Sequence, residues 1–220
     1  MLNRSRTTTP QSRFHKRGWY QTHCQHNVLL TKKDPTLLLI GDSIVAGLSR
    51  YKTVWDKHFA GYNTINCGIG GDKIQHTLWR AEKLKLPQSI RFIFVCSGTN
   101  NLETDCPQDI VDGLVCVALS LKRKLNHVHV IVSGILPRGL LPSKKRKKIN
   151  QINNKLEHIF KKNTYINIIY LRPGNDWINE NGIINTSLFY KDFLHLIEPG
   201  NNKFALSFKH LLLSLTSSSS

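Results

Sequence analysis

Five short apolar runs alternate with longer amphipathic segments along this chain, and this alternation limits the folds open to it most strongly. The runs are rich in β-branched or aromatic residues and end at turn residues, as buried parallel strands do. They lie at residues 36–41, 63–68, 91–98, 127–135 and 165–171. The spacing of apolar residues predicts helices at 73–84, 107–125, 143–162 and about 200–214. This alternation predicts an α/β fold, a three-layer α/β/α sandwich around a five-stranded parallel sheet.

The two ends of the chain differ from this repeating middle. Residues 1–35 hold seven Lys or Arg residues and one acid, so we expect a basic, flexible N-terminal extension. Trp19 and Tyr20 indicate that part of it docks onto another surface. Residues 36–215 are expected to form one folded domain, of ordinary size for a single core. Residues 216–220, TSSSS, are an expected disordered tail.

The chain is strongly basic, with 31 Lys and Arg against 14 Asp and Glu and a formal net charge of +17. Such an excess attracts polyanions such as nucleic acid, anionic lipid headgroups or acidic proteins. One basic run lies near the start of the predicted helix at 143–162. It could be a solvated helix face, a nuclear-targeting signal or a site that contacts phosphate backbones. These candidate polyanion-binding residues are Lys144, Lys145, Arg146, Lys147 and Lys148.

The sequence also bears on the compartment. No apolar stretch approaches the roughly 20 residues that a membrane-spanning helix needs. The N-terminus has basic residues but no apolar segment, which argues against a secretory signal and leaves a transit peptide open. The five cysteines are odd in number and scattered, which favours reduced thiols over a disulfide framework. We therefore expect an intracellular protein, with cytoplasm and nucleus both open.

Polar, glycine-rich turns follow the predicted strands, and in a parallel sheet such turns meet at the carboxyl edge, where ligands bind. Acyl transfer requires a hydroxyl, a base, a group that orients the base, and donors for an oxyanion. Ser43 supplies the hydroxyl, His195 the base, and Asp192, three residues earlier, the orienting carboxylate. Gly71 can expose a backbone N–H, Asn100 offers an amide donor, and the Ser43 N–H adds a third.

The motifs at these strand ends resemble, in order and spacing, the four sequence blocks of the SGNH (GDS-type) hydrolases. The blocks are Gly41-Asp42-Ser43, Gly71, Gly98-x-Asn100 and Asp192-x-x-His195. Within that group the chain is similar to the catalytic subunits of intracellular type-I platelet-activating factor acetylhydrolase. The stretches that carry this likeness are GIGGD (68–72), HTLWR (76–80), GTNN (98–101), GILPRG (134–139) and DFLHL (192–196).

The resemblance spans about residues 37–210 and implies more than the residues alone do. It implies a flavodoxin-like fold, a Ser43–Asp192–His195 triad and an oxyanion hole from Ser43, Gly71 and Asn100. It implies no metal and no organic cofactor. It also implies hydrolysis of an ester with a short acyl chain such as acetyl, and, by analogy only, a homodimer. It does not explain the basic residues at the N-terminus or in the run at 144–148.

Each candidate residue also has a purely structural interpretation. Ser43 could be a helix N-cap, because Asp-Ser before an apolar run is a common cap sequence. Asp192 and His195 could be surface residues of a turn. Asn100 could cap the next helix, a role for which Asn101 is the better candidate.

Two further groups are open to more than one interpretation. His23, Cys24 and His26 suggest a metal cluster, but no second ligand pair follows at zinc-site spacing. Trp79 and Arg80 are expected to serve helix packing and the surface.

The sequence supports two main functions. The first is a serine esterase of the SGNH type, with Ser43, Asp192 and His195 as its triad. The second is a protein that binds nucleic acid or another polyanion, with an SGNH-like domain as scaffold, as in some retroelement-encoded proteins that carry such a domain. A catalytically inactive interaction module is a third hypothesis, against which the intact triad residues argue. Nucleic-acid affinity would fall steeply with salt, which separates the second function from the first.

Overall fold

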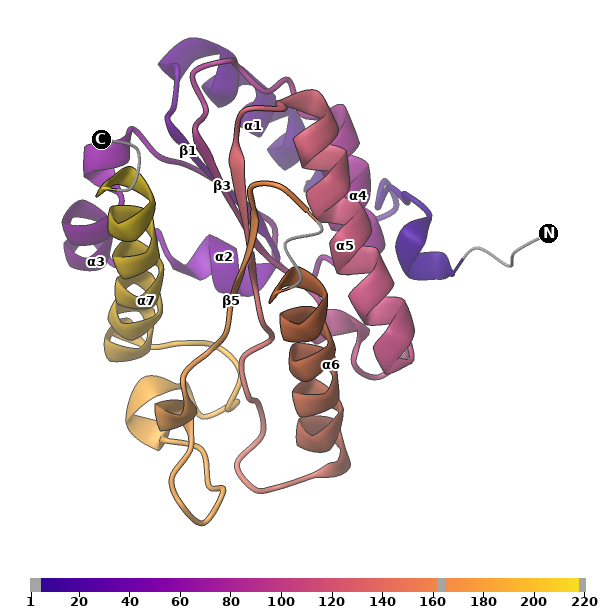
Figure 1. Ribbon diagram of the computed structural model, residues 1–220, viewed down its shortest axis with the longest axis vertical. Helices are drawn as coiled ribbons and strands as arrows, with labels where there is room; N and C mark the ends of the chain where they lie inside the picture. Colours follow the sequence, from indigo (N-terminus) through magenta and orange to yellow (C-terminus); the bar gives the residue numbers. More distant parts are fainter. Residues whose placement is uncertain (1–4, 162–164, 218–220) are drawn as a thin grey trace.

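A five-stranded parallel sheet forms the centre of the computed structural model, which describes residues 5–161 and 165–217 (Figure 1). The strands are β1 (Leu37–Gly41), β2 (Ile65–Gly68), β3 (Phe92–Cys96), β4 (His129–Ser133) and β5 (Ile168–Leu171). Their order across the sheet is β2-β1-β3-β4-β5, and every neighbouring pair is parallel. This is the strand order of flavodoxin-like folds, so the predicted fold class is confirmed.

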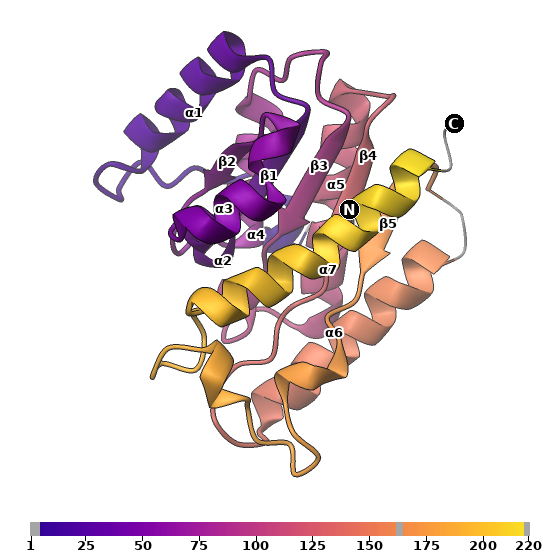
Figure 2. The same cartoon turned by 90° about the vertical axis from the view of Figure 1, so that its left-hand side faces the viewer.

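Helices cover both faces of the sheet (Figures 1 and 2). One face carries α1 (Trp19–Lys33), α4 (Ile74–Lys83), α5 (Pro107–Lys124) and α6 (Lys144–Lys161). The other face carries α2 (Ser43–Gly47), α3 (Lys52–His58) and α7 (Glu198–Ser217). The four predicted helices correspond to α4, α5, α6 and α7, whereas α1, α2 and α3 have no counterpart in the sequence prediction.

β1 is buried along its whole length, which explains its unbroken apolar sequence. Its side chains alternate between two apolar clusters. Leu38 and Ile40 pack on the side of α4 and α5, and Leu37 and Leu39 pack on the side of α7. The carboxyl end of β1 is therefore held from both faces of the sheet.

Two glycines let α2 approach the carboxyl ends of β1 and β2. A Cβ on Gly41 would lie 2.6 Å from Val45 Cγ2 in α2, and a Cβ on Gly68 would lie 2.2 Å from the backbone nitrogen of Ala46 in α2. Both distances are far inside van der Waals contact, so a larger residue at either position would force the backbones apart. The close approach brings Ser43, the first residue of α2, against the ends of both strands.

Residues 5–33 pack onto the domain, which differs from the flexible extension expected for residues 1–35. A 3₁₀ turn at Arg6–Thr8 precedes α1, and its Thr7 hydroxyl donates to the carbonyl oxygen of Asp109 at 2.6 Å. Thr7 is fully buried. The N-terminal segment therefore contributes to the same core as α4 and α5.

Two of the buried residues of α1 are histidines, which makes its helical pattern hard to recognise in the sequence. The buried residues of this helix are Trp19, His23, His26 and Leu30, at helical spacing. Burial lowers the pKa of His23 and of His26 to about 4, so both rings are neutral at pH 7 and pack as apolar groups. Counted as polar residues, they break the apolar stripe that would otherwise predict a helix.

The structure also bears on three expectations about the ends and the surface of the chain. The predicted tail at residues 216–220 begins inside α7, and residues 218–220 lie outside the described part of the chain. Among the described helices, none combines the length and the hydrophobicity that crossing a membrane demands. The five cysteines all lie in the described residues and form no disulfide.

Candidate active site

The carboxyl end of β1 leads directly into α2 through Asp42. The Asp42 carboxylate accepts a hydrogen bond from the Ile44 N–H at 2.9 Å and so caps the helix. The interpretation of Ser43 as an N-cap is therefore wrong, because the preceding aspartate holds that position. Burial raises the pKa of Asp42 to about 7, and Ser43 is left as the first helical residue with its hydroxyl free to meet a partner.

The base candidate lies on a tight turn between α7 and the preceding 3₁₀ turn. Asp192 Oδ1 accepts hydrogen bonds from the backbone N–H groups of Leu194 and His195, each at 3.0 Å. Phe193, which lies between Asp192 and Leu194, adopts φ +50°. The Tyr190 N–H donates to the carbonyl oxygen of His195 at 2.8 Å. These bonds fold the loop back on itself and bring the carboxylate beside the imidazole three residues later.

The structure brings Ser43, Asp192 and His195 into one chain of contacts. His195 Nε2 lies 2.9 Å from Ser43 Oγ, and His195 Nδ1 lies 2.6 Å from Asp192 Oδ2. Partial burial of Asp192 opposes its charge, but hydrogen bonds from the His195 ring and from two backbone N–H groups lower the pKa of Asp192 below its ordinary value. An ionised carboxylate on Nδ1 fixes the tautomer in which Nε2 can accept the proton of the hydroxyl.

The predicted oxyanion donors lie on the next two loops. Gly71 has φ +75°, a left-handed conformation that favours glycine, and Asn100 Nδ2 donates to the carbonyl oxygen of Asp72 at 2.9 Å. A Cβ on Gly70 would lie 4.0 Å from Ser43 Cβ, so the residue before Gly71 is the one next to the serine. Asn101 caps α4 rather than the helix that follows it, because its Oδ1 accepts from the Ile74 N–H at 2.9 Å.

An open hollow of about 690 Å³ surrounds the serine and the histidine. Two cationic residues at its rim, Arg50 and Lys191, and the ring of Tyr190 carry no signal in the sequence motifs. The Arg50 guanidinium lies over the Tyr190 ring, 5.5 Å from its centroid. The lining residues are Ser43, Ala46, Gly47, Arg50, Gly70, Tyr190, Lys191, Asp192 and His195.

A buried ion pair lies beneath the site. Arg80 and Asp72 are fully buried, and Arg80 Nε donates to Asp72 Oδ2 at 2.7 Å. The same guanidinium donates to the carbonyl oxygen of Gly41 at 2.7 Å and to that of Cys67 at 2.5 Å. The expectation of a helix-surface arginine is wrong, because Arg80 links the ends of β1 and β2 to the turn that carries Gly71.

The basic run at 144–148 is only partly available to a ligand. Arg146 is buried and donates to the carbonyl oxygens of Gly139, Leu140 and Gly182, so its assignment as a polyanion-binding residue is wrong. Lys148 Nζ donates to the carbonyl oxygen of Leu102 at 2.6 Å, and Lys145 forms an ion pair with Glu103. Lys144 and Lys147 remain exposed.

The suspected cluster of metal ligands in α1 does not form. Within the described ranges, 5–161 and 165–217, no three His, Cys, Asp or Glu side chains are placed to hold a metal ion. Cys24 is exposed, whereas His23 is buried and packs against the rings of Trp19 and Trp79. The two histidines of α1 serve packing.

Solved structures of known proteins share the fold of this chain. No family model matches the sequence. A GDSL-like lipase from Bacteroides thetaiotaomicron superposes with a TM-score of 0.74 at 20% identity, over 89% of this chain and 98% of the lipase. A carbohydrate esterase family 3 protein from Talaromyces cellulolyticus superposes with a TM-score of 0.63 at 17% identity, over 84% and 99% of the two chains. These likenesses show that the chain has the fold of these GDSL-type and esterase structures.

Curated relatives show the family to which the chain belongs. Human platelet-activating factor acetylhydrolase IB subunit alpha1 is 30% identical over 199 residues, which cover 90% of this chain and 84% of the subunit. The human alpha2 subunit is 29% identical over 198 residues with the same coverage. The chain belongs to the family of platelet-activating factor acetylhydrolase IB subunits within the SGNH hydrolases. It is therefore an enzyme of the ester-hydrolysing GDSL type.

Proposed function

We propose that this enzyme is a serine esterase in which Ser43 is the nucleophile, His195 the general base and Asp192 the residue that orients the base. The observation that carries the proposal is the unbroken chain of contacts from Asp192 Oδ2 through both ring nitrogens of His195 to Ser43 Oγ. The three residues line one open hollow. A hydroxyl, an imidazole and a carboxylate in this order are the requirements of acyl transfer.

In the acylation step, Ser43 Oγ attacks the carbonyl carbon of the ester while its proton passes to His195 Nε2. The new C–O bond moves an electron pair onto the carbonyl oxygen, and Asp192 stabilises the imidazolium that forms. Collapse of this tetrahedral intermediate breaks the bond to the leaving alcohol, which takes the proton from Nε2. The products of this half-reaction are the free alcohol and an acylated Ser43.

In the second half-reaction, water replaces the alcohol. His195 Nε2 takes a proton from the water as its oxygen attacks the acyl carbon, and the bond to Ser43 Oγ then breaks. The serine recovers its proton from the imidazolium, and a carboxylic acid leaves. The enzyme returns to its starting state, so no other reactant is consumed.

The oxyanion of both intermediates needs donors, for which we propose the backbone N–H groups of Ser43 and Gly71 and the side-chain amide of Asn100. The bond from Asn100 to the Asp72 carbonyl uses one of its two N–H groups and holds the amide in place. The position of Gly70 against Ser43 supports a role for the same turn. Losing one such donor lowers kcat by about 10²–10³-fold in comparable sites.

A small hollow lined by Asp42 and Ile44, the residues on either side of Ser43 in the sequence, favours a short acyl chain. Its volume is about 10 Å³, which is room for a group the size of one water molecule or a methyl. The open hollow around the serine has a volume of about 690 Å³. The small hollow is bordered by the immediate neighbours of Ser43 and His195. The lining residues are Asp42, Ile44, Cys96, Ser97, Thr99, Ile135, Leu136 and Leu194.

A fluorophosphonate probe and a series of p-nitrophenyl esters test this proposal. Wild type and Ser49→Ala, which alters an exposed serine just after α2, should be labelled. Ser43→Ala should not. The kcat/KM should fall by about 10-fold or more between acetate and hexanoate, because each extra methylene overpacks the small hollow. Equal labelling of wild type and Ser43→Ala, or no labelling of either protein, would refute the proposed esterase activity.

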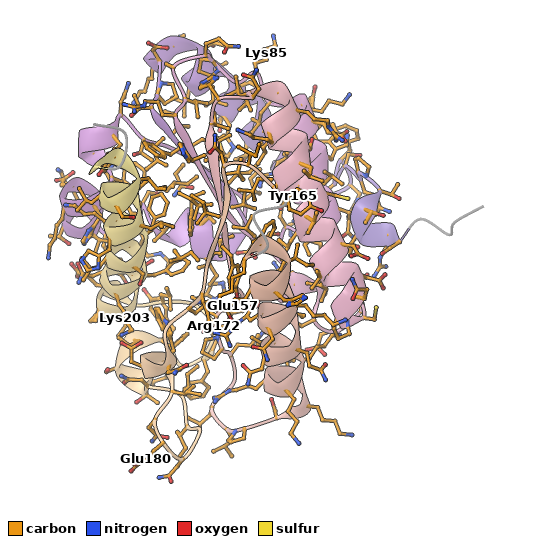
Figure 3. All side chains as sticks on the ribbon, in the orientation of Figure 1. Lys85, Glu157, Tyr165, Arg172, Glu180 and Lys203 are labelled. Atoms are coloured by element: carbon orange, nitrogen blue, oxygen red, sulfur yellow. The ribbon has the colours of Figure 1, made fainter. Side chains whose placement is uncertain are left out.

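We propose polyanion binding as a second candidate function, on a surface other than the run at 144–148. Six exposed cations lie on three chain segments that lead into β1, β3 and β4, where these strands begin; Lys85 is labelled in Figure 3. We call this the amino-edge patch. Among the described residues, none of the six forms an ion pair. They are Lys32, Lys33, Lys83, Lys85, Arg91 and Arg123.

Hydrogen bonds hold the three segments of the amino-edge patch together. The Lys85 N–H donates to Asn27 Oδ1 at 2.7 Å, and Lys124 Nζ donates to the carbonyl oxygen of Glu82 at 2.9 Å. A fixed array of unpaired cations fits the phosphates of a nucleic-acid backbone. The patch lies at the opposite edge of the sheet from Ser43, so esterase activity and polyanion binding do not compete for residues.

Binding of a single-stranded oligonucleotide at several salt concentrations tests the second function. Charge-neutralising changes at Lys32, Lys33 and Lys85 should weaken binding and flatten its salt dependence, while the same changes at Lys144 and Lys147 should have less effect. Esterase activity should persist in both variants. Binding that ignores salt, or none at all, would exclude this function.

Two further proposals concern assembly, from family analogy alone, and location, from the scattered cysteines that form no disulfide. We propose a homodimer, which sedimentation of the pure protein tests. We also propose an intracellular location in cytoplasm or nucleus, which imaging of a tagged chain tests.

A further inference from the structure

Arg13 reaches from the N-terminal segment onto the turn that follows β2, residues 69–72. Its Nη1 donates to the carbonyl oxygen of Gly70 at 3.2 Å and to Asp72 Oδ1 at 3.0 Å. One guanidinium nitrogen thus bridges the two residues that flank Gly71. A Cβ built on Gly71 would lie 3.4 Å from Nη2 and 3.5 Å from Nη1 of Arg13, so the guanidinium packs directly against this glycine.

The 69–72 turn presents free donors beside the serine. Gly71 takes φ +75°, and the Asp72 N–H closes the turn on the carbonyl oxygen of Ile69 at 3.2 Å. Among the described residues, the backbone N–H groups of Gly70 and Gly71 have no acceptor. A turn with two glycines gains little rigidity from its own side chains, so its shape depends on the groups that hold it from outside.

Arg13 and Arg80 hold Asp72 from two sides and do different work. Asp72 Oδ2 accepts from Arg80 Nε at 2.7 Å, and Oδ1 accepts from Arg13 and, at 2.8 Å, from Trp19 Nε1. Without Arg13 the carboxylate would keep one buried guanidinium and one indole donor, so its charge would stay compensated. What would be lost is the bond to the Gly70 carbonyl and the contact with Gly71.

The N-terminal segment holds Arg13 firmly enough to act on the turn. The Arg13 side chain is only 14% exposed. The Gln11 N–H donates to the carbonyl oxygen of Gln75 in α4 at 3.0 Å, and the Phe14 ring lies edge-on to Trp79 at 5.5 Å. Contacts on both sides of Arg13 in the sequence therefore anchor it to the helix that begins just after the turn.

We propose that Arg13 is a positioning residue for the esterase: it holds the 69–72 turn so that its free N–H groups stay aimed at the oxyanion formed on Ser43. This inference rests on the proposed function. Arg13 acts through the turn and contacts no reacting atom. Its loss should lower kcat more than it raises KM, because a donor that shifts by a fraction of an ångström stabilises the transition state less.

Three variants test the inference in the full chain. Arg13→Gln should lower kcat on p-nitrophenyl acetate by about 10-fold with KM changed less than about 2-fold, a loss smaller than that of removing a donor outright. Arg13→Lys, which can keep one bond to the turn, should recover part of kcat. Arg17→Gln removes the same charge from an exposed position of the same segment and should match wild type. A kcat of Arg13→Gln equal to that of Arg17→Gln would overturn the inference.

Amide hydrogen exchange separates failure of the inference from failure of the proposed function. In Arg13→Gln, exchange at residues 69–72 should speed up relative to Arg17→Gln, while the thermal midpoints of the two variants stay close. If wild type shows no Ser43-dependent activity, the proposed function fails, and unchanged exchange at the turn would then overturn the positioning role as well. In a wild type that shows Ser43-dependent activity, faster exchange confined to the turn supports the positioning role.

Discussion

The buried carboxyl group of Asp42 makes a sharp prediction about the pH dependence of stability. Burial raises its pKa from 3.8 to about 7 in the folded protein. Between these two values the folded state binds one more proton than the unfolded state at this residue. The free energy of unfolding therefore falls as the pH rises through this window. Asp42→Asn removes the titration and keeps an oxygen to accept from the Ile44 N–H.

The size of the effect follows from the slope. One proton of difference changes the free energy of unfolding by about 1.36 kcal/mol per pH unit. From pH 5 to pH 8, wild type should lose about 2.5 kcal/mol relative to Asp42→Asn, most of it below pH 7. Other titrating groups are common to both proteins and cancel in this comparison. Any pH-independent cost of the buried amide cancels as well.

Urea unfolding followed by tryptophan fluorescence at pH 5, 6, 7 and 8 measures this difference. The gap between the two proteins should open in favour of Asp42→Asn as the pH rises. Parallel curves across the whole range would refute the argument, because they would mean that Asp42 has the same pKa folded and unfolded.

Four more predictions follow from the contacts. Asp192→Asn should lower kcat by about 10³-fold or more, because the amide no longer fixes the imidazole tautomer; an unchanged kcat on p-nitrophenyl acetate would exclude the proposed role. Arg80→Met should destabilise the fold by about 3–5 kcal/mol or more through the lost buried ion pair, and unaltered urea unfolding would contradict this. Gly41→Ala should lower the thermal midpoint far more than Gly61→Ala, which has open space for a Cβ. Between pH 6.5 and 4 the unfolded state binds a proton at His26 that the folded state, with its lowered pKa, does not, so acid favours unfolding. His26→Leu removes this contribution and should lose less stability than wild type as the pH falls from 6.5 to 4.

The sheet could be predicted because its strands are buried on both faces. A run such as 37–41 has no polar position to confuse the pattern, and four of the helices carry apolar stripes of ordinary length. α2 and α3 cannot be predicted from the sequence, because their five and seven residues are too few to reveal the helical period of 3.6 residues. α1 was concealed by neutral, buried histidines, whose state depends on the packing around them.

The residues of the candidate site divide in the same way. Ser43, Asp192 and His195 could be named because each lies in a short motif whose spacing reflects local backbone geometry. Arg13 and Arg80 could not, because an arginine in a basic sequence is most often a solvated residue. For the same reason the sequence places Arg146 among the candidate polyanion-binding residues, whereas the structure buries it against four carbonyl oxygens.

The sequence by itself determined where the five strands and four of the helices lie along the chain and which groups can do chemistry, because apolar periodicity and short motifs are local properties. Only the tertiary structure decided which charges are used up inside the fold and which remain free. That outcome depends on burial and on carbonyl oxygens contributed by residues distant in the chain. The desolvation of an arginine such as Arg80 is acceptable only when those partners meet it in space.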